Sequence, residues 1–168
     1  MRTWLDPFYK ALGALGALFI LATLVIEVVN IAGRELGYSM AGIDAYAGYT
    51  LAAGSFLAMA AALRQGDHIR VTLIIQRFTG RPRWWMEVFC LTVASLLSGY
   101  FAYFAAKLVW GSYVYNDVSQ NVDATPLWIP QLSMAVGLGA LFLAFLEELL
   151  QTLRTRTVVT PTRSGQIE

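Results

Sequence analysis

The amino-acid sequence predicts an all-α membrane protein with four transmembrane helices and a short amphipathic surface helix between the second and third of them. Of its 168 residues, 57% are hydrophobic and only 14% are charged, which leaves too little polar surface for a water-soluble domain of this size. Four apolar stretches, at residues 11–32, 45–63, 85–106 and 127–147, each approach the about 20 residues that a helix needs to cross the hydrocarbon core. Because unpaired backbone groups are costly in lipid, these stretches are predicted to be helices.

The first apolar stretch is interpreted as a retained helix. It follows Arg2 and Lys10, as the core of a signal peptide would, but it continues to Ile31 and exceeds the usual core of about 7 to 15 residues. The end of the chain is polar and contains Pro161 and Gly165, which is typical of a disordered segment. We therefore expect one four-helix transmembrane domain over residues 1–156 and a disordered cytoplasmic tail over residues 157–168.

The basic residues predict how the spans are oriented. Of the twelve Lys and Arg, two precede the first span, five lie between the second and third, and three follow the fourth, whereas only Arg34 and Lys107 fall on the other side. Cytoplasmic loops carry the excess of Lys and Arg, so both termini and the middle loop are predicted to lie in the cytoplasm. The loop over residues 111–125 then faces outward, and it is acidic, with Asp117 and Asp123 and no basic residue.

The middle loop has the pattern of a helix that lies on a membrane surface. Its apolar residues Val71, Ile74, Ile75 and Phe78 follow the i, i+3, i+4, i+7 spacing. An amphipathic helix with basic residues on its other face is expected to lie in the inner leaflet. The lipid anchors predicted at this level are Arg70, Arg77, Arg81, Trp84 and Trp85.

One carboxylate, that of Glu27, lies inside the first apolar stretch. Asn30 and Arg34 follow at i+3 and i+7, so the three residues share one helix face. A charge at this depth is costly unless it meets protein or water, which turns this face toward another helix. Two interpretations stay open, a proton or cation site and a structural polar clamp of Glu27, Asn30 and Arg34. The sequence offers no second buried acid for a relay, which favours the clamp.

The second span is rich in small residues. They include Gly48, Ala52, Gly54, Ala58 and Ala62, spaced so that helices can pack backbone to backbone. Because they occupy more than one side of this helix, a contact with another protein is predicted. The fourth span has a similar set.

The densest polar cluster comprises Arg64, Asp67 and His68. A His beside an Asp needs a pocket and an orienting group before it can act as a general base, so this cluster is interpreted as a loop staple. His68 is the single histidine, which excludes a two-histidine haem site within the chain. Cys90 is the single cysteine and is interpreted as a small core residue. We expect no catalytic residue, no metal site and no cofactor in this chain.

Three features together resemble a known family. They are residues 63–71 (LRQGDHIRV), Arg34 after an Asn-containing first span, and residues 125–131 (TPLWIPQ), all placed around four spans. This pattern resembles the small membrane subunit of tripartite ATP-independent periplasmic (TRAP) transporters, the DctQ family, over residues from about 10 to 150. The resemblance implies a system of three proteins, in which a soluble periplasmic protein binds substrate and a large elevator-type membrane subunit carries substrate and sodium.

In such a system this chain would be a non-catalytic scaffold for the large subunit in the bacterial inner membrane, and the substrate would be an organic acid. We expect its outward charged residues to help dock the periplasmic binding protein; they are Arg34, Asp44, Asp117 and Asp123. Membrane lipids are the other expected partner, and nucleic acid is not one. The alternative is an autonomous, homodimeric, proton-coupled exporter that uses Glu27.

Overall fold

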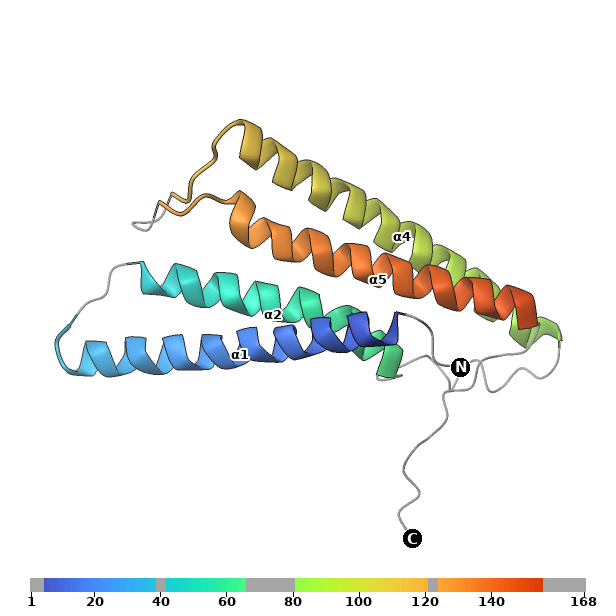
Figure 1. Cartoon of the computed structure of the whole chain (residues 1–168), viewed down its shortest axis with the longest axis horizontal. Helices are drawn as coiled ribbons and strands as arrows, with labels where there is room; N and C mark the ends of the chain where they lie inside the picture. The colour runs from blue at the N-terminus through green and yellow to red at the C-terminus, as the bar shows by residue number, and fades with distance from the viewer. Residues whose placement is uncertain (1–4, 39–41, 66–80, 121–123, 156–168) are drawn as a thin grey trace, which may run out of the picture.

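A computed structural model of the chain describes residues 5–38, 42–65, 81–120 and 124–155, and these fold into four long helices (Figure 1). The helices are α1 (Asp6–Glu35), α2 (Ile43–Gln65), α4 (Arg81–Val114) and α5 (Trp128–Thr155). Each is long and apolar enough to cross a membrane, which confirms the prediction of an all-helical fold with four candidate spans. The predicted surface helix over residues 71–78 lies outside the described residues.

The helices are longer than the apolar stretches that predicted them. The third apolar stretch covers residues 85–106, whereas α4 has 34 residues and so measures about 51 Å, against about 30 Å of hydrocarbon. Helical hydrogen bonding continues through the interfacial layers, where polar and aromatic residues are tolerated. Local signals set the start of α1, because Pro7 stands in its first turn and the carboxylate of Asp6 suits the positive end of the helix dipole.

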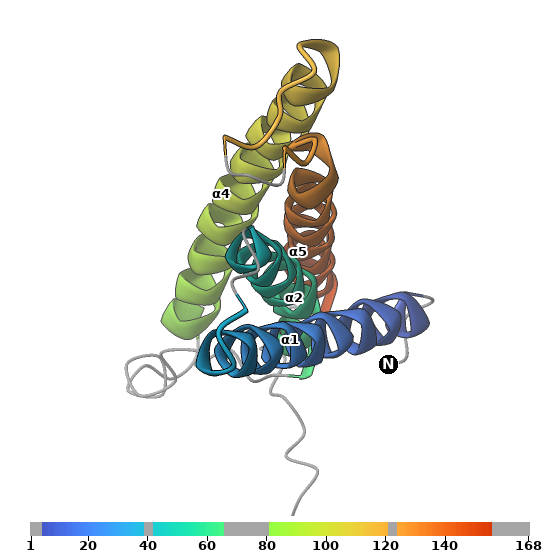
Figure 2. The ribbon, with the colours of Figure 1, turned by 90° about the vertical axis from the view of Figure 1, so that its left-hand side faces the viewer.

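The four helices form an open row. Helix α1 packs on α2, α2 packs on α5, and α5 packs on α4. Figure 1 shows this order from bottom to top, and Figure 2 shows along the helices that α2 lies between α1 and α5. Helices α1 and α4 therefore stand at the two ends of the row, each with one extensive neighbour. Along the helix axes, we call the end of the bundle at which α1 and α4 begin the proximal end, and the opposite end the distal end.

Glycines bring the neighbouring backbones close together. A Cβ on Gly16 of α1 would lie 3.0 Å from the carbonyl oxygen of Gly54 on α2, and a Cβ on Gly137 of α5 would lie 2.4 Å from that of Phe56. The small residues of α2 thus pack backbone to backbone, as predicted, but two of its sides are occupied by α1 and α5. Small residues on several sides of α2 therefore do not by themselves require another protein.

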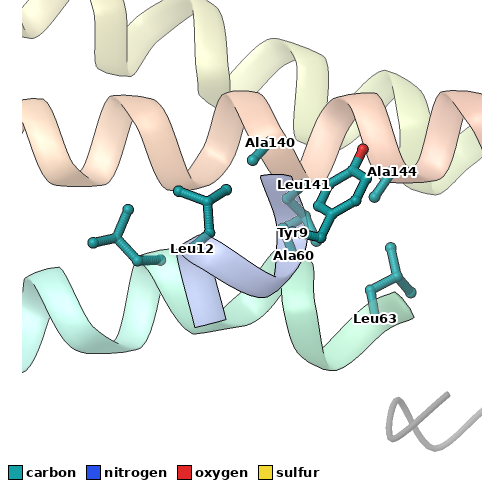
Figure 3. Close-up of a cluster of buried hydrophobic side chains, with 8 residues drawn as sticks. Tyr9, Leu12, Ala60, Leu63, Ala140, Leu141 and Ala144 are labelled. Atoms are coloured by element: carbon teal, nitrogen blue, oxygen red, sulfur yellow. The ribbon is translucent and has the colours of Figure 1, made fainter. Parts of the chain in front are cut away.

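The buried core lies where α1, α2 and α5 meet. Figure 3 shows its side chains, which are Tyr9, Leu12, Leu57, Ala60, Leu63, Ala140, Leu141 and Ala144. They come from the first turns of α1, the second half of α2 and the middle of α5, which places the core toward the proximal end. Three of the eight are alanines, and the larger side chains fill the space that these leave between the helices.

Candidate functional site

Charged side chains tie three helices together near the proximal end. Arg64, in the last turn of α2, forms an ion pair with Glu147 of α5, and its guanidinium carbon lies 4.7 Å from the ring centroid of Tyr9 on α1. The side chains of Arg64 and Glu147 are only 24% and 23% exposed. A planar guanidinium can pair with a carboxylate and stack on an aromatic ring at the same time, so one residue links α1, α2 and α5.

A second proximal contact joins the remaining helix. The indole nitrogen of Trp84 on α4 donates a hydrogen bond to the carbonyl oxygen of Thr152 on α5, at 3.2 Å. Thr152 is completely buried, and Glu87, one turn after Trp84, is also buried. All four helices are therefore connected by polar contacts at this level.

The structure describes only some of the residues that were predicted to form the loop staple and the lipid anchors. Arg64 belongs to α2, while Asp67, His68, Arg70 and Arg77 lie outside the described residues, so the loop staple and these lipid anchors stay predictions. The side chains of Trp84 and Trp85 meet edge to face with their centroids 5.1 Å apart, and that of Trp85 is exposed. Arg81 is the first residue of α4. Lipid anchoring by Arg81, Trp84 and Trp85 also stays a prediction.

Glu147 is the residue that the sequence reasoning missed. The sequence contained evidence for its pairing, because an acidic residue at the end of an apolar stretch needs a partner. Arg64 lies at the same end of the bundle, in the last turn of α2.

At the distal end, side-chain hydrogen bonds join α1 and α2. The side-chain nitrogen of Asn30, which is buried, donates to Oδ1 of Asp44 at 2.5 Å. Two turns deeper, the hydroxyl oxygens of Thr23 and Thr50 lie 2.8 Å apart. These contacts hold the distal halves of the first two helices together.

The other members of the predicted polar clamp lie apart from this bond. Glu27 and Arg34 are both exposed on α1, and no ion pair within the described residues joins them. The structure thus brings Asn30 to Asp44, which was predicted for docking, and leaves Glu27 and Arg34 open on the surface. The functional role of each stays a prediction.

The two described parts of the distal connection between α4 and α5 pair with each other. Val118 and Pro126 form an antiparallel bridge, and the backbone of Leu127 donates to the carbonyl of Asp117 at 3.0 Å. The hydroxyls of Thr125 and Tyr46 lie 3.1 Å apart, which ties this connection to α2. The side chain of Asp117 is exposed, and Asp123 lies outside the described residues. Of the predicted docking residues, Arg34, Asp44 and Asp117 therefore all lie at the distal end.

Neither a candidate metal site nor a buried thiol is found among the described residues. No group of three or more His, Cys, Asp and Glu residues in this part of the chain could hold a metal ion. Cys90 is free and exposed on α4, so its interpretation as a core residue was wrong. The reason is that α4 stands at the end of the row, with most of its circumference facing away from the other helices.

Four helices, each long and apolar enough to cross a membrane, define a multi-pass membrane protein of the helical class. A comparison with protein families then identifies it further. The family of tripartite ATP-independent periplasmic transporters, DctQ component, matches residues 23–155, and the chain belongs to this family. The protein is therefore a component of a transporter. No curated protein and no solved structure gives a significant match.

Proposed function

We propose that this chain is the small permease subunit of a sodium-coupled TRAP system that takes up an organic acid, and that it acts as a scaffold for the large elevator-type subunit. The main support for this proposal is the open row of helices. In the most apolar stretch of α1 only 11% of the residues are buried, and in that of α4 only 17%. Such end helices leave wide apolar faces that a second membrane protein can cover.

Contacts at both the proximal and the distal end of the bundle suit a scaffold. The Arg64–Glu147 pair and the Trp84–Thr152 hydrogen bond connect the helices proximally, and the Asn30–Asp44 hydrogen bond connects α1 to α2 distally. An elevator mechanism needs a part that keeps its shape while another domain slides past it. Helices fixed to one another at two levels resist relative sliding, which supports the assignment of this chain to the fixed part.

The distal surface suits transient docking of a periplasmic binding protein. Arg34, Asp44 and Asp117 are exposed there, and the bridged connection holds Asp117 on a folded support. Charges at the rim of an interface speed association and set orientation while adding little affinity, which fits a partner that must arrive and leave. With the positive-inside orientation, this end faces the periplasm and both termini lie in the cytoplasm of a bacterium.

Reconstitution of the complete system tests the proposed function. The chain is co-purified with the large membrane subunit, placed in liposomes with an inward sodium gradient, and given the binding protein and a radiolabelled organic acid. Uptake is expected only when all three proteins and the gradient are present. Liposomes that contain this chain alone are expected to match empty liposomes, and robust uptake by the single chain would contradict the proposal. The family match gives no support to the alternative of an autonomous exporter.

A further inference from the structure

Glu27 places a carboxylate on the outside of a membrane-spanning helix. It is exposed, and it lies five residues before the end of the apolar stretch over residues 11–32, about 7.5 Å along the helix axis. Its neighbours on the same face, Leu24 at i−3 and Ile31 at i+4, are 59% and 57% exposed. The carboxylate thus borders apolar side chains that are themselves uncovered.

No other described residue satisfies this carboxylate. Asn30, one turn further on, is occupied by Asp44, and Arg34 forms no ion pair with Glu27. A glutamate side chain is too short to carry its charge to the interface from this depth, in contrast to the long Lys and Arg side chains that snorkel. An acid on a lipid-facing surface is costly, and such residues usually face protein and pair with a partner.

The patch around Glu27 defines the chemistry of that partner. Ile20, one helical repeat before Glu27, packs against Gly54 of α2, so the patch borders the seam between α1 and α2. An apolar surface with one negative charge inside a bilayer is matched by an apolar helix with one positive charge at the same depth. A soluble protein cannot reach this depth, and lipid tails offer no cation.

We propose that Glu27 binds a Lys or Arg side chain on a transmembrane helix of the large TRAP subunit, and that the face formed by Leu24, Glu27 and Ile31 is the site where that helix packs. This inference rests on the proposed function, because it takes the large subunit to be a stable partner. It assigns to Glu27 a role in assembly and not in proton transfer.

Co-purification of the full chain with its large subunit in mild detergent tests the assignment. Glu27→Lys places a like charge against the partner and is expected to lower the amount of retained large subunit on the order of tenfold or more. The matched control is Glu35→Lys, which changes an exposed acid at the end of the same helix and is expected to leave retention unchanged. An acidic substitution at the paired Lys or Arg of the large subunit should restore retention with Glu27→Lys.

The possible failures are distinguishable. If the unaltered chain does not retain the large subunit at all, the proposed function itself fails. If it does, and Glu27→Lys retains as much as Glu35→Lys, only the role of Glu27 is overturned. The isolated Glu27→Lys chain should elute as the unaltered chain does, since no described residue bonds to Glu27; a loss of the folded, monodisperse species would also overturn the assignment.

Photo-crosslinking locates the contact independently of stability. A photoreactive residue at Ile31 is expected to form an adduct with the large subunit, whereas one at Val29, which is also exposed but on the opposite side of α1, is not. Adducts from Val29 alone would overturn the proposal. Lys107 is an exposed cation on α4. An adduct between two copies of this chain that disappears with Lys107→Gln would also overturn the proposal, because Lys107 of a second copy would then be the partner of Glu27.

Discussion

Arg64 is the residue on which most of the proximal contacts depend. It meets a carboxylate on α5 and an aromatic ring on α1, and both charged groups are largely shielded from solvent. Removing one member of a shielded pair leaves the other charged group without compensation, which costs more than the pair contributes in itself.

Arg64→Met is therefore expected to destabilise the chain by about 1 to 3 kcal/mol, somewhat less than for a fully buried pair because about a quarter of each side chain is exposed. The measurement is thermal unfolding in detergent. Arg154→Met, at an exposed position near the end of α5, serves as the control and should change the melting temperature little. A double variant Arg64→Met, Glu147→Leu should recover part of the loss; equal melting temperatures for Arg64→Met and Arg154→Met would show that the pair contributes nothing.

A variant at Arg34 can distinguish a role in docking the binding protein from a structural role. It is exposed at the distal end, and no ion pair within the described residues joins it to Glu27. Arg34→Glu is expected to slow uptake that depends on the binding protein, more strongly at low salt, because an exposed charge acts mainly on association. The membrane complex should stay assembled. Unchanged uptake at low and high salt would remove Arg34 from the docking surface, and loss of the complex would instead favour a structural role.

At the scale of the helices, close backbone packing decides which faces are used. The two glycines of α5 differ sharply, because a Cβ on Gly137 would press against the backbone of Phe56, whereas one on Gly139 would meet nothing within 4 Å. The two positions lie on the same helix and differ in their neighbours, so they make a matched pair.

Gly137→Ala is expected to force α2 and α5 apart and to destabilise the chain by about 1 to 3 kcal/mol, the usual range for overpacking. Gly139→Ala is expected to be neutral or to stabilise the chain by up to about 1 kcal/mol, since alanine favours a helix more than glycine does. Thermal unfolding of both variants in detergent checks this. A Gly137→Ala variant as stable as Gly139→Ala would mean that α2 and α5 do not approach as closely as described.

At the scale of the whole molecule, the antiparallel row fixes which segments share a side of the membrane. The beginnings of α1 and α4 and the ends of α2 and α5 lie at the proximal end. In a Cys90→Ser background, a cysteine at Tyr115 is expected to react with an impermeant reagent added outside, and one at Arg154 only after the membrane is opened. Both residues are exposed in the fold, so access depends on the membrane alone. Labelling in the reverse pattern would invert the predicted topology.

Four helices, small-residue contacts on α2 and membership of the family could all be predicted from the amino-acid sequence alone. These properties are local, because apolar length, the spacing of glycines and the order of motifs can be read along one chain. The helix ends were placed less well, since helices such as α4 continue past the apolar stretch into the interface.

The order of the helices in the row and the partners of the polar residues became known only from the three-dimensional arrangement. Glu147 for Arg64 and Asp44 for Asn30 follow from which helices are neighbours and at what height they meet, as does the open position of Glu27. Which helices become neighbours, and at what level along their axes they meet, depends on how many small and large side chains fit together across the interfaces. The residue pattern of a single helix does not contain this information.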